Sequence, residues 1–256
     1  MALLVDLIKL LDDTLSPQLF KDYCPNGLQV EGASEVNKIV LGVTACQSLI
    51  DAAIERKADA ILVHHGYFWR NEMAQLVGMK KERIKSLLTN DISLIAYHLP
   101  LDVHPLYGNN VQLAQRLGIS VDGGLEPDNP RSVGSFGCLA QSMSGDSLAS
   151  HIEKVLGRKP LHIAPERGDV QREITQVAWC TGGAQSYIDK AVALGVDAYI
   201  TGEVSEATVH TAREMGIHFF AAGHHATERY GVQALGKMLA EKMGVITEFV
   251  DIDNPV

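Results

Sequence analysis

An internal repeat constrains the fold of this chain more than any other feature. Residues 39–53 match residues 177–191 at a constant offset of 138 (177 − 39 = 138), with Gln, Ser, Ile, Asp and Ala recurring in register. The match continues from residues 59–62 to residues 197–200 at the same offset. Each copy has an apolar β run, a small-residue turn, a helical stretch and a second apolar run, which is typical of a βαβ unit. The repeat therefore predicts a duplicated α/β chain.

The two copies also stay parallel further along the chain. Each continues with a predicted helix, at residues 80–89 and 206–215, and then with an apolar strand that ends at His98 or His224. The offset between these histidines is 126 (224 − 98 = 126), so the intervening segment is shorter in the second copy. Duplication explains so long a match better than chance does. Further helices are expected near residues 111–117 and 232–243.

The predicted architecture is α/β, with two duplicated halves that each contain a sheet flanked by helices. The halves are residues 1–125 and 126–256, because residues 123–130 have the Gly- and Pro-rich composition of a linker. The C-terminal elements are free to pack on the first half. The second half opens with added elements. These are a strand at 134–140, a helix at 147–156 with Asp146 as its N-cap, and a strand at 160–163.

Composition and charge limit the class of protein. Hydrophobic residues make up 46% of the 256 residues, which is enough for a packed interior and argues against a disordered chain. The formal net charge of −9 argues against a nucleic-acid partner, because a phosphate backbone needs a basic face.

No segment indicates a membrane or secretory protein. Residues 1–11 have apolar positions at helical spacing but no basic n-region, so they predict an amphipathic helix and not a signal peptide. No apolar run reaches the ~18 residues of a membrane span. Cys24, Cys46, Cys138 and Cys180 form no C-x-x-C pair, and we expect reduced thiols in a cytoplasmic protein.

Histidines stand where three of the predicted strands end. His64 and His65 close one apolar run, His98 closes the next, and His224 and His225 close the corresponding run of the second copy. In open α/β sheets, ligands bind outside the carboxyl ends of the strands. Imidazole together with carboxylate is the ligand set of catalytic Zn, Fe and Mn. The pattern therefore predicts a metal site.

Metal ligation is the favoured interpretation for four residues, which are His64, His65, His224 and Glu228. His64 and His65 would point to opposite faces of a regular strand, but a bend at its end allows both to converge. His224 and Glu228 are spaced i, i+4, which places them on one face if a helix begins there. His225 would then point elsewhere and suits a supporting role.

Asp102 and His98 are less clearly defined by spacing. Pro100 argues against a regular helix from His98, so Asp102 is either a turn residue or a ligand. Its alignment with Glu228, also at offset 126 (228 − 102 = 126), favours ligation. For His98 we leave open whether it binds metal or orients a ligand or substrate.

Other residues near these strand ends have plainer interpretations. The second copy has Gly202-Glu203 in place of His64-His65, so it lacks the paired imidazoles, although Glu203 could still line the site. Glu206 and His210 suit an exposed helix surface. Tyr67-Phe68-Trp69 could stack on a planar ring or be buried at a subunit contact, and the sequence does not decide between these roles.

Several motifs together resemble a known family. They are Asn26–Gln29, Val63–Gly66, His98–Asp102, Ile200–Glu203 and Ala222–Glu228. On these residues the chain resembles, from end to end, the short bacterial form of the Nif-three-like family, whose members are called GTP cyclohydrolase 1 type 2 homologs. The resemblance implies a dinuclear metal site between the halves, with His64, His65, Asp102, His224 and Glu228 as ligands. It also implies a toroidal homohexamer with the sites facing an internal cavity.

The leading hypothesis is a metal-dependent hydrolase with two divalent ions, Fe, Zn or Mn, at about 3.5–4 Å separation. His98 or His225 would move protons or orient a small-molecule substrate. For a purine nucleotide such as GTP, water would open the imidazole ring, although a phosphoester or cyclic amide suits the same site. The alternative is a non-catalytic metal-binding protein with a regulatory or assembly role. Five protein ligands over two ions leave room for water, which favours catalysis.

Overall fold

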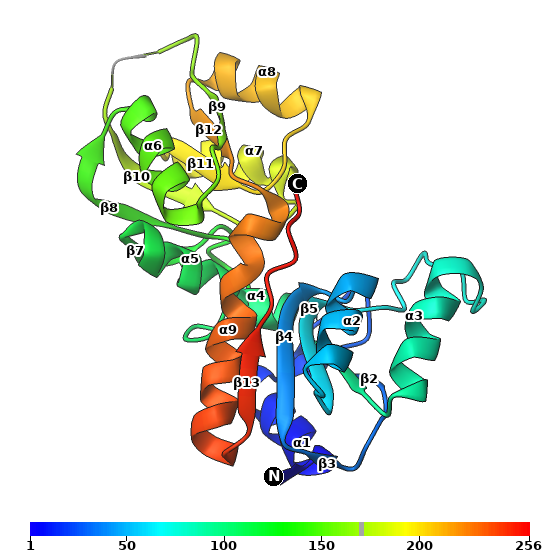
Figure 1. The fold of residues 1–256 in the computed structure, drawn as a ribbon. Helices are drawn as coiled ribbons and strands as arrows, with labels where there is room; N and C mark the ends of the chain where they lie inside the picture. The colour runs from blue at the N-terminus through cyan, green and yellow to red at the C-terminus, as the bar shows by residue number, and fades with distance from the viewer. Residues whose placement is uncertain (169–171) are drawn as a thin grey trace. The chain divides into compact units, whose positions relative to one another are not determined.

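The computed structural model describes residues 1–168 and 172–256, which form two compact units (Figure 1). Unit 1 comprises Met1–Tyr107 and Gly231–Asp253, and unit 2 comprises Gly108–Tyr230 and Asn254–Val256. The boundary between the predicted halves, 1–125 and 126–256, stays a prediction. The chain passes from unit 1 to unit 2 after Tyr107, and its C-terminal segment 231–253 belongs to unit 1 again.

A five-stranded sheet forms the centre of unit 1, in the order β13-β4-β5-β6-β2. Its strands are β2 (Gly27–Val30), β4 (Lys38–Thr44), β5 (Ala60–His65), β6 (Ser93–Ala96) and β13 (Ile246–Phe249). Strands β13, β4, β5 and β6 are parallel, whereas β2 pairs antiparallel with β6. The central strands are apolar and buried almost throughout, as expected for parallel strands covered on both faces.

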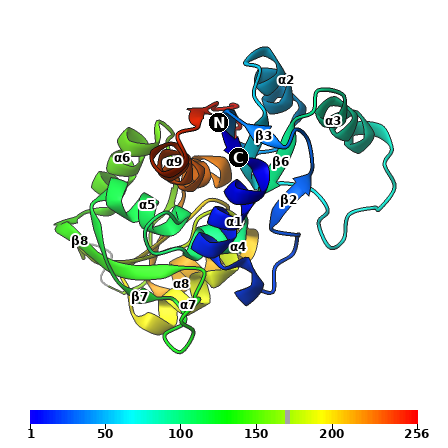
Figure 2. The same cartoon turned by 90° about the horizontal axis from the view of Figure 1, so that it is seen from below.

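Helices cover both faces of this sheet (Figure 2). One core joins Leu4, Leu7, Leu11 and Leu15 of helix α1 to the C-terminal part of α9. The other core lies under α2 and α3. The helices of this unit are α1 (Leu4–Leu15), α2 (Gln47–Glu55), α3 (Gly78–Thr89), α4 (Leu99–Val103) and the end of α9 (His224–Met243). The remaining elements are β1 (Ala2–Leu3), which pairs with β3 (Glu35–Val36), and a 3-10 turn, η1 (Pro17–Leu19).

Unit 2 repeats this plan with additional strands, in the order β7-β8-β10-β11-β12-β9. Its strands are β7 (Ile119–Gly124), β8 (Ser135–Met143), β9 (Leu161–Ile163), β10 (Ile174–Trp179), β11 (Ala198–Thr201) and β12 (His218–Ala221). Strands β10, β11 and β12 are parallel, and the other pairings are antiparallel. Helices α5 (Asn109–Leu117) and α6 (Gly145–Leu156) cover one face. Helices α7 (Ile188–Leu194), preceded by the 3-10 turn η2 (Gln185–Tyr187), and α8 (Glu206–Met215) cover the other.

Strand register confirms the duplication. Ile39 pairs with Ala60 in unit 1, and Val177 pairs with Ala198 in unit 2, so both strands keep the offset of 138 (177 − 39 and 198 − 60). The third strands differ slightly, because Ala60 pairs with Ser93 whereas Ala198 pairs with His218, an offset of 125 (218 − 93).

The changed offset adds one residue between the third strand of unit 2 and its histidine. His98 stands two residues beyond the end of β6 at Ala96, whereas His224 stands three beyond the end of β12 at Ala221. The residue before His224 is Gly223, whose φ of +102° is accessible mainly to glycine. Both histidines therefore follow equivalent strands, but His224 is displaced by one position.

Two local predictions were wrong. The N-cap of α6 is Ser144 and not Asp146, since the Ser144 side chain accepts from the backbone N–H of Ser147 at 3.2 Å. A helix, α4, does begin directly after His98, despite Pro100. Proline is tolerated in a first helical turn, because the N–H that it lacks would have no partner within the helix.

Two further findings bear on the expected class of protein. The four cysteines form no disulfide. Among the described residues, no helix combines the length and apolar character required to cross a bilayer.

Candidate metal centre

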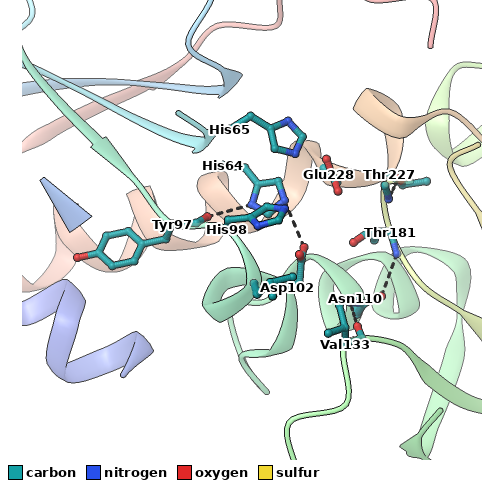
Figure 3. A network of polar contacts seen from close by, with 12 residues as sticks. His64, His65, Tyr97, His98, Asp102, Asn110, Val133, Thr181, Thr227 and Glu228 are labelled. Atoms are coloured by element: carbon teal, nitrogen blue, oxygen red, sulfur yellow. Dashed lines mark hydrogen bonds and ion pairs between the residues drawn. The ribbon is translucent and has the colours of Figure 1, made fainter. Parts of the chain in front are cut away.

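His64 is the most firmly held of the predicted ligands in unit 1 (Figure 3). It lies near the end of β5 with no exposed side-chain surface, and its Nδ1 lies 2.9 Å from the carbonyl oxygen of Tyr97. A carbonyl can only accept, so Nδ1 carries the proton and Nε2 has a lone pair. This Nε2 faces Asp102 Oδ1 at 3.4 Å. Two acceptors in this arrangement suit a cation, and a backbone carbonyl behind the imidazole is typical of metal-ligating histidines.

Asp102 reaches this position through helix α4. Its backbone N–H donates to the carbonyl of His98 at 3.2 Å, so the four-residue spacing between them is helical after all. The residue is 5% exposed. The spacing of His98 and Asp102 therefore matches that of His224 and Glu228 in the second copy.

His65 and His98 lie beside His64. Their ring centroids are 4.5 Å and 5.1 Å from that of His64, and each of the three side chains offers a ligand atom within 4.8 Å of the others. His65 is half-buried, with Nδ1 at 3.2 Å from the Thr44 hydroxyl. Both paired histidines belong to β5, and their rings nevertheless lie together at its end. Unit 1 contains a cluster of imidazole groups that could bind a metal ion.

In unit 2, His224 stands between two carboxylates. Its Nδ1 lies 2.7 Å from Glu203 Oε1, and its Nε2 lies 3.2 Å from Glu228 Oε2. Burial alone would lower the pKa of His224, but Glu228 and Glu203 outweigh burial and raise this pKa to about 9. The surroundings therefore favour a positive charge at this place, which either a proton or a metal ion supplies.

The local fold of unit 2 allows this close approach. His224 is the first residue of α9, and Glu228 follows one turn later with 3% exposure. The turn after β10 contains Gly182, with φ +72°, and a Cβ there would lie 2.1 Å from Glu228 Oε1. The N–H of Gly182 donates to the Thr227 hydroxyl at 3.0 Å. The left-handed φ and the close carboxylate therefore both favour glycine at this position.

The other predicted positions have different surroundings. His225 is half-buried on α9, and its backbone N–H donates to the carbonyl of Val256 at 3.0 Å. Glu206 and His210 are exposed on α8, as predicted. Glu203, whose role the sequence left open, holds the ring of His224.

The aromatic segment after His65 does not present a single stacking face. Tyr67 is buried and donates its hydroxyl to the carbonyl of Ala45 at 2.7 Å, whereas Phe68 is exposed. Trp69 is half-buried, with its ring 5.0 Å from that of His98 in an edge arrangement. Tyr67 therefore belongs to the core, whereas Trp69 borders the histidine cluster.

Sequence reasoning missed Asp22. Its Oδ1 lies 2.7 Å from Nδ1 of His98, although the two residues are 76 positions apart. Nothing in the local spacing around Asp22 marks this contact. The nearest signal was the Asn26-Gly27 pair, which is typical of a turn and which lies in the same short segment.

Comparison with known proteins identifies the family. Residues 2–255 match the family described as Duf34/NIF3 (NGG1p interacting factor 3). The chain belongs to the Duf34/NIF3 family. Among family relatives, the GTP cyclohydrolase 1 type 2 homolog of Vibrio cholerae serotype O1 is 61% identical over 252 residues, covering 98% of this chain and 99% of that protein. The Escherichia coli K12 protein of the same name is 54% identical over 251 residues, with 98% of each chain covered.

Solved structures of Duf34/NIF3 relatives share the fold over the whole chain. A protein called ybgI, described as of unknown function, has a TM-score of 0.94 at 51% identity, covering 100% of both chains. The TTHA1606 protein of Thermus thermophilus has a TM-score of 0.88 at 31% identity, again covering 100% of both. The resemblance inferred from the sequence motifs is thereby confirmed.

Proposed function

We propose that this Duf34/NIF3 member is a hydrolase that depends on two divalent metal ions per chain. The proposed ligands are His64, His65 and Asp102 from unit 1 and His224 and Glu228 from unit 2. One observation carries the proposal, namely that each unit sets an imidazole Nε2 against a buried carboxylate. The separations are 3.4 Å for His64–Asp102 and 3.2 Å for His224–Glu228. A pair of this kind in each copy suits two ions better than one.

The donor set fits a transition metal. Imidazole with carboxylate suits Zn, Fe and Mn, and does not distinguish among them. Two such ions, when bound, supply Lewis acidity and bring the pKa of water towards neutrality. The residues behind the ligands orient them: the Tyr97 carbonyl holds the ring of His64, and Glu203 holds the ring of His224.

The proposed substrate is a small molecule, with a purine nucleotide as the first choice. The relatives carry the name GTP cyclohydrolase 1 type 2 homolog, and hydrolytic opening of an imidazole ring suits the proposed site. His98 and His225 are the proposed proton-moving or orienting residues.

We further propose a toroidal homohexamer. Exposed apolar side chains cluster along residues 68–79 of unit 1, including Met73, Leu76, Val77 and Met79. Apolar surface of this kind is typical of a contact between subunits. Sedimentation velocity tests this directly, and a monomer at micromolar concentration would contradict it.

Metal analysis of untagged protein, purified without added metal, is the first test. We expect about two ions per chain at full loading, each visible in an anomalous difference map. The same sample is then incubated with GTP, bis(p-nitrophenyl) phosphate and hydantoin, which represent a purine ring, a phosphoester and a cyclic amide. A single fully occupied site with four protein ligands would contradict the dinuclear proposal.

Glu228→Gln tests the ligand assignment, with Glu206→Gln as its control. Glutamine keeps the size of Glu228 but removes the charge that holds a divalent ion. We expect metal affinity to fall by at least about 10–100-fold, the range for losing a residue that merely supports a ligand. Glu206 is exposed at the start of α8, so its variant should keep metal and thermal stability. Equal metal loss in both variants, or full retention in Glu228→Gln, would refute the assignment.

A further inference from the structure

We propose that Asp22 is a positioning residue that holds His98 in one tautomer, with the proton on Nδ1, so that Nε2 serves as a proton acceptor during hydrolysis. The catalytic part of this inference rests on the proposed function. The tautomer itself can be measured without any substrate.

The contact between the two side chains determines which nitrogen carries the proton. Asp22 Oδ1 lies 2.7 Å from Nδ1 of His98, and the Asp22 side chain is 3% exposed. Burial raises the pKa of Asp22, but the hydrogen bonds and charge of His98, together with hydrogen bonds from Asn26 and the Tyr23 N–H, outweigh burial and lower it. An ionised carboxylate only accepts, so Nδ1 of His98 must donate.

The same short segment also fixes the backbone of His98. Asp22 Oδ2 accepts from the Leu99 N–H at 3.0 Å and from the Asn26 side chain at 2.9 Å. Asn26 Oδ1 in turn accepts from the His98 N–H at 2.7 Å. Two side chains of residues 22–26 therefore hold both the ring and the main chain of His98.

The position of the ring gives this arrangement a chemical use. The His98 side chain is 15% exposed, and its ring lies 5.1 Å from that of His64. The ring of Trp69 lies 5.0 Å from the His98 ring in a T-shaped arrangement. With Nδ1 committed to Asp22, Nε2 is the nitrogen with a lone pair. A half-buried imidazole of fixed tautomer next to a proposed metal ligand is suited to take a proton from a reacting group.

A metal site made of Asp22, Cys24 and His98 is the competing interpretation. One ligand atom from each lies within 4.8 Å of the others. However, in the absence of a metal ion, burial and the charge of Asp22 raise the pKa of the Cys24 thiol to about 12. The 2.7 Å contact between Asp22 and His98 is also a hydrogen-bond distance, which leaves no room for an ion between these two atoms.

The decisive experiment is ¹⁵N NMR of histidine-labelled protein, both metal-free and zinc-loaded. His98→Gln identifies the signals of His98. We expect the Nδ1–H tautomer in the wild type and a shift towards the Nε2–H tautomer in Asp22→Asn, because the asparagine amide can donate to Nδ1. Asp22→Glu should restore the wild-type tautomer. Asp12→Asn is the matched control, since Asp12 accepts from the neighbouring Tyr97 hydroxyl at 2.6 Å and should not affect His98.

The second measurement concerns catalysis and metal content. On any probe that the wild type hydrolyses, we expect Asp22→Asn to lower kcat by about 10²–10⁴-fold with KM and both ions retained. An unchanged His98 tautomer in Asp22→Asn overturns the positioning role, whether or not a substrate is found. A changed tautomer with unchanged kcat overturns the catalytic role. Loss of zinc in Asp22→Asn, or a third zinc in the wild type, would show that His98 is a ligand and overturns it as well. Absence of hydrolysis in the wild type refutes the proposed function. The tautomer result then decides by itself whether Asp22 positions His98.

Discussion

The two units hold the proposed histidine ligands His64 and His224 in different ways. His64 of unit 1 is fully buried and donates to a main-chain carbonyl, whereas the His224 side chain of unit 2 is 29% exposed and lies between two carboxylates. By the offset of 138, Gly202 corresponds to His64 (202 − 64) and Glu203 to His65 (203 − 65). A residue that is a proposed ligand in one copy is therefore a support for a ligand in the other. Duplication preserved the backbone while the chemistry of the strand ends diverged.

The second copy has a steric reason for lacking the paired imidazoles. A Cβ at Gly202 would lie 2.5 Å from the Cα of His224, so the start of α9 passes directly over this position. In unit 1 the helix after the third strand, α4, begins at the equivalent point, three residues beyond its strand, yet the buried side chain of His64 is accommodated there. Unit 2 therefore cannot have a histidine at position 202 and keep the present path of the chain at His224.

The strongest test of this contrast is Gly182→Ala, compared with Gly195→Ala. Both glycines have φ +72°, but a Cβ at Gly182 meets Glu228 whereas one at Gly195 meets nothing within 4 Å. We expect both variants to lose about 1–2 kcal/mol of unfolding free energy from left-handed strain. Only Gly182→Ala should also lose metal affinity, by at least about tenfold, because its methyl group displaces the carboxylate.

Denaturant unfolding and metal titration separate the two contributions. Equal metal affinity in the two variants would mean that the close approach of Gly182 to Glu228 has no part in ion binding. A loss of metal in Gly195→Ala would mean that general destabilisation of unit 2 accounts for the effect.

A second test concerns an aspartate that the copies share. Asp59 Oδ2 accepts from the N–H groups of Asn37 and Lys38 at 2.8 and 2.9 Å, and Asp197 Oδ2 accepts from Thr175 and Gln176, both at 2.9 Å. These contacts obey the offset of 138 atom for atom. Each aspartate therefore links the start of one strand to the start of the strand that follows it in the repeat. These strands are β4 and β5 in unit 1, and β10 and β11 in unit 2.

We expect Asp59→Ala and Asp197→Ala each to cost about 1–3 kcal/mol, because each leaves two N–H groups without their acceptor. The loss should be larger for Asp197, which is more deeply buried and also pairs with Arg172 at 2.8 Å. Hydrogen exchange at residues 37–38 and 175–176 reports each unit separately. Equal losses would show that burial and the ion pair add nothing. Arg172→Ala is the control for the ion pair, and it should cost little because Arg172 is 64% exposed.

The strands and helices of the duplicated core, and most of the residues at the strand ends, could be predicted from the sequence. The evidence for them lies in residues that are close together along the chain. The repeat around Gln47 and Gln185 specified strand, helix and strand in both copies, and the register bears this out. The helix spacing of His224 and Glu228 was also correct. Other features depend on contacts that no local pattern encodes. Strand β13 pairs with β4 across 208 positions (246 − 38 = 208), and Asp22 reaches His98 across 76.

Two errors came from applying a local rule without knowledge of the tertiary structure. Proline is a helix breaker by the local rule, but Pro100 occupies the first turn of α4, where proline is tolerated. Asp146 and Ser144 are both good N-cap residues, and only the position of the first helical N–H groups distinguishes them. Local propensity narrows such choices to neighbouring residues, and packing then selects one of them.

The smallest expected effect is a pH dependence that arises in unit 2 and has no counterpart at the same position of unit 1. His162 Nε2 and His218 Nδ1 lie 2.9 Å apart, and the His162 ring stacks on Phe220 at 4.5 Å. By strand register, the residue of unit 1 that corresponds to His218 is Ser93.

Burial lowers the pKa of both histidines below the ordinary value of 6.5. The neighbouring charge of His162 lowers the pKa of His218 further, and the opposing carboxylates Asp146 and Asp197 do not compensate. Below about pH 6.5 the unfolded chain therefore binds more protons at these positions than the folded chain does. The unfolding free energy should be greatest above this pH and fall as the pH drops towards the folded-state values. His218→Ser, which introduces the residue of the first copy, should flatten this slope between pH 5 and 7, although His162 retains part of it. Chemical denaturation across this range, with the variant subtracted from the wild type, cancels the histidines common to both. Identical slopes would mean that the buried pair is not the source of the acid sensitivity.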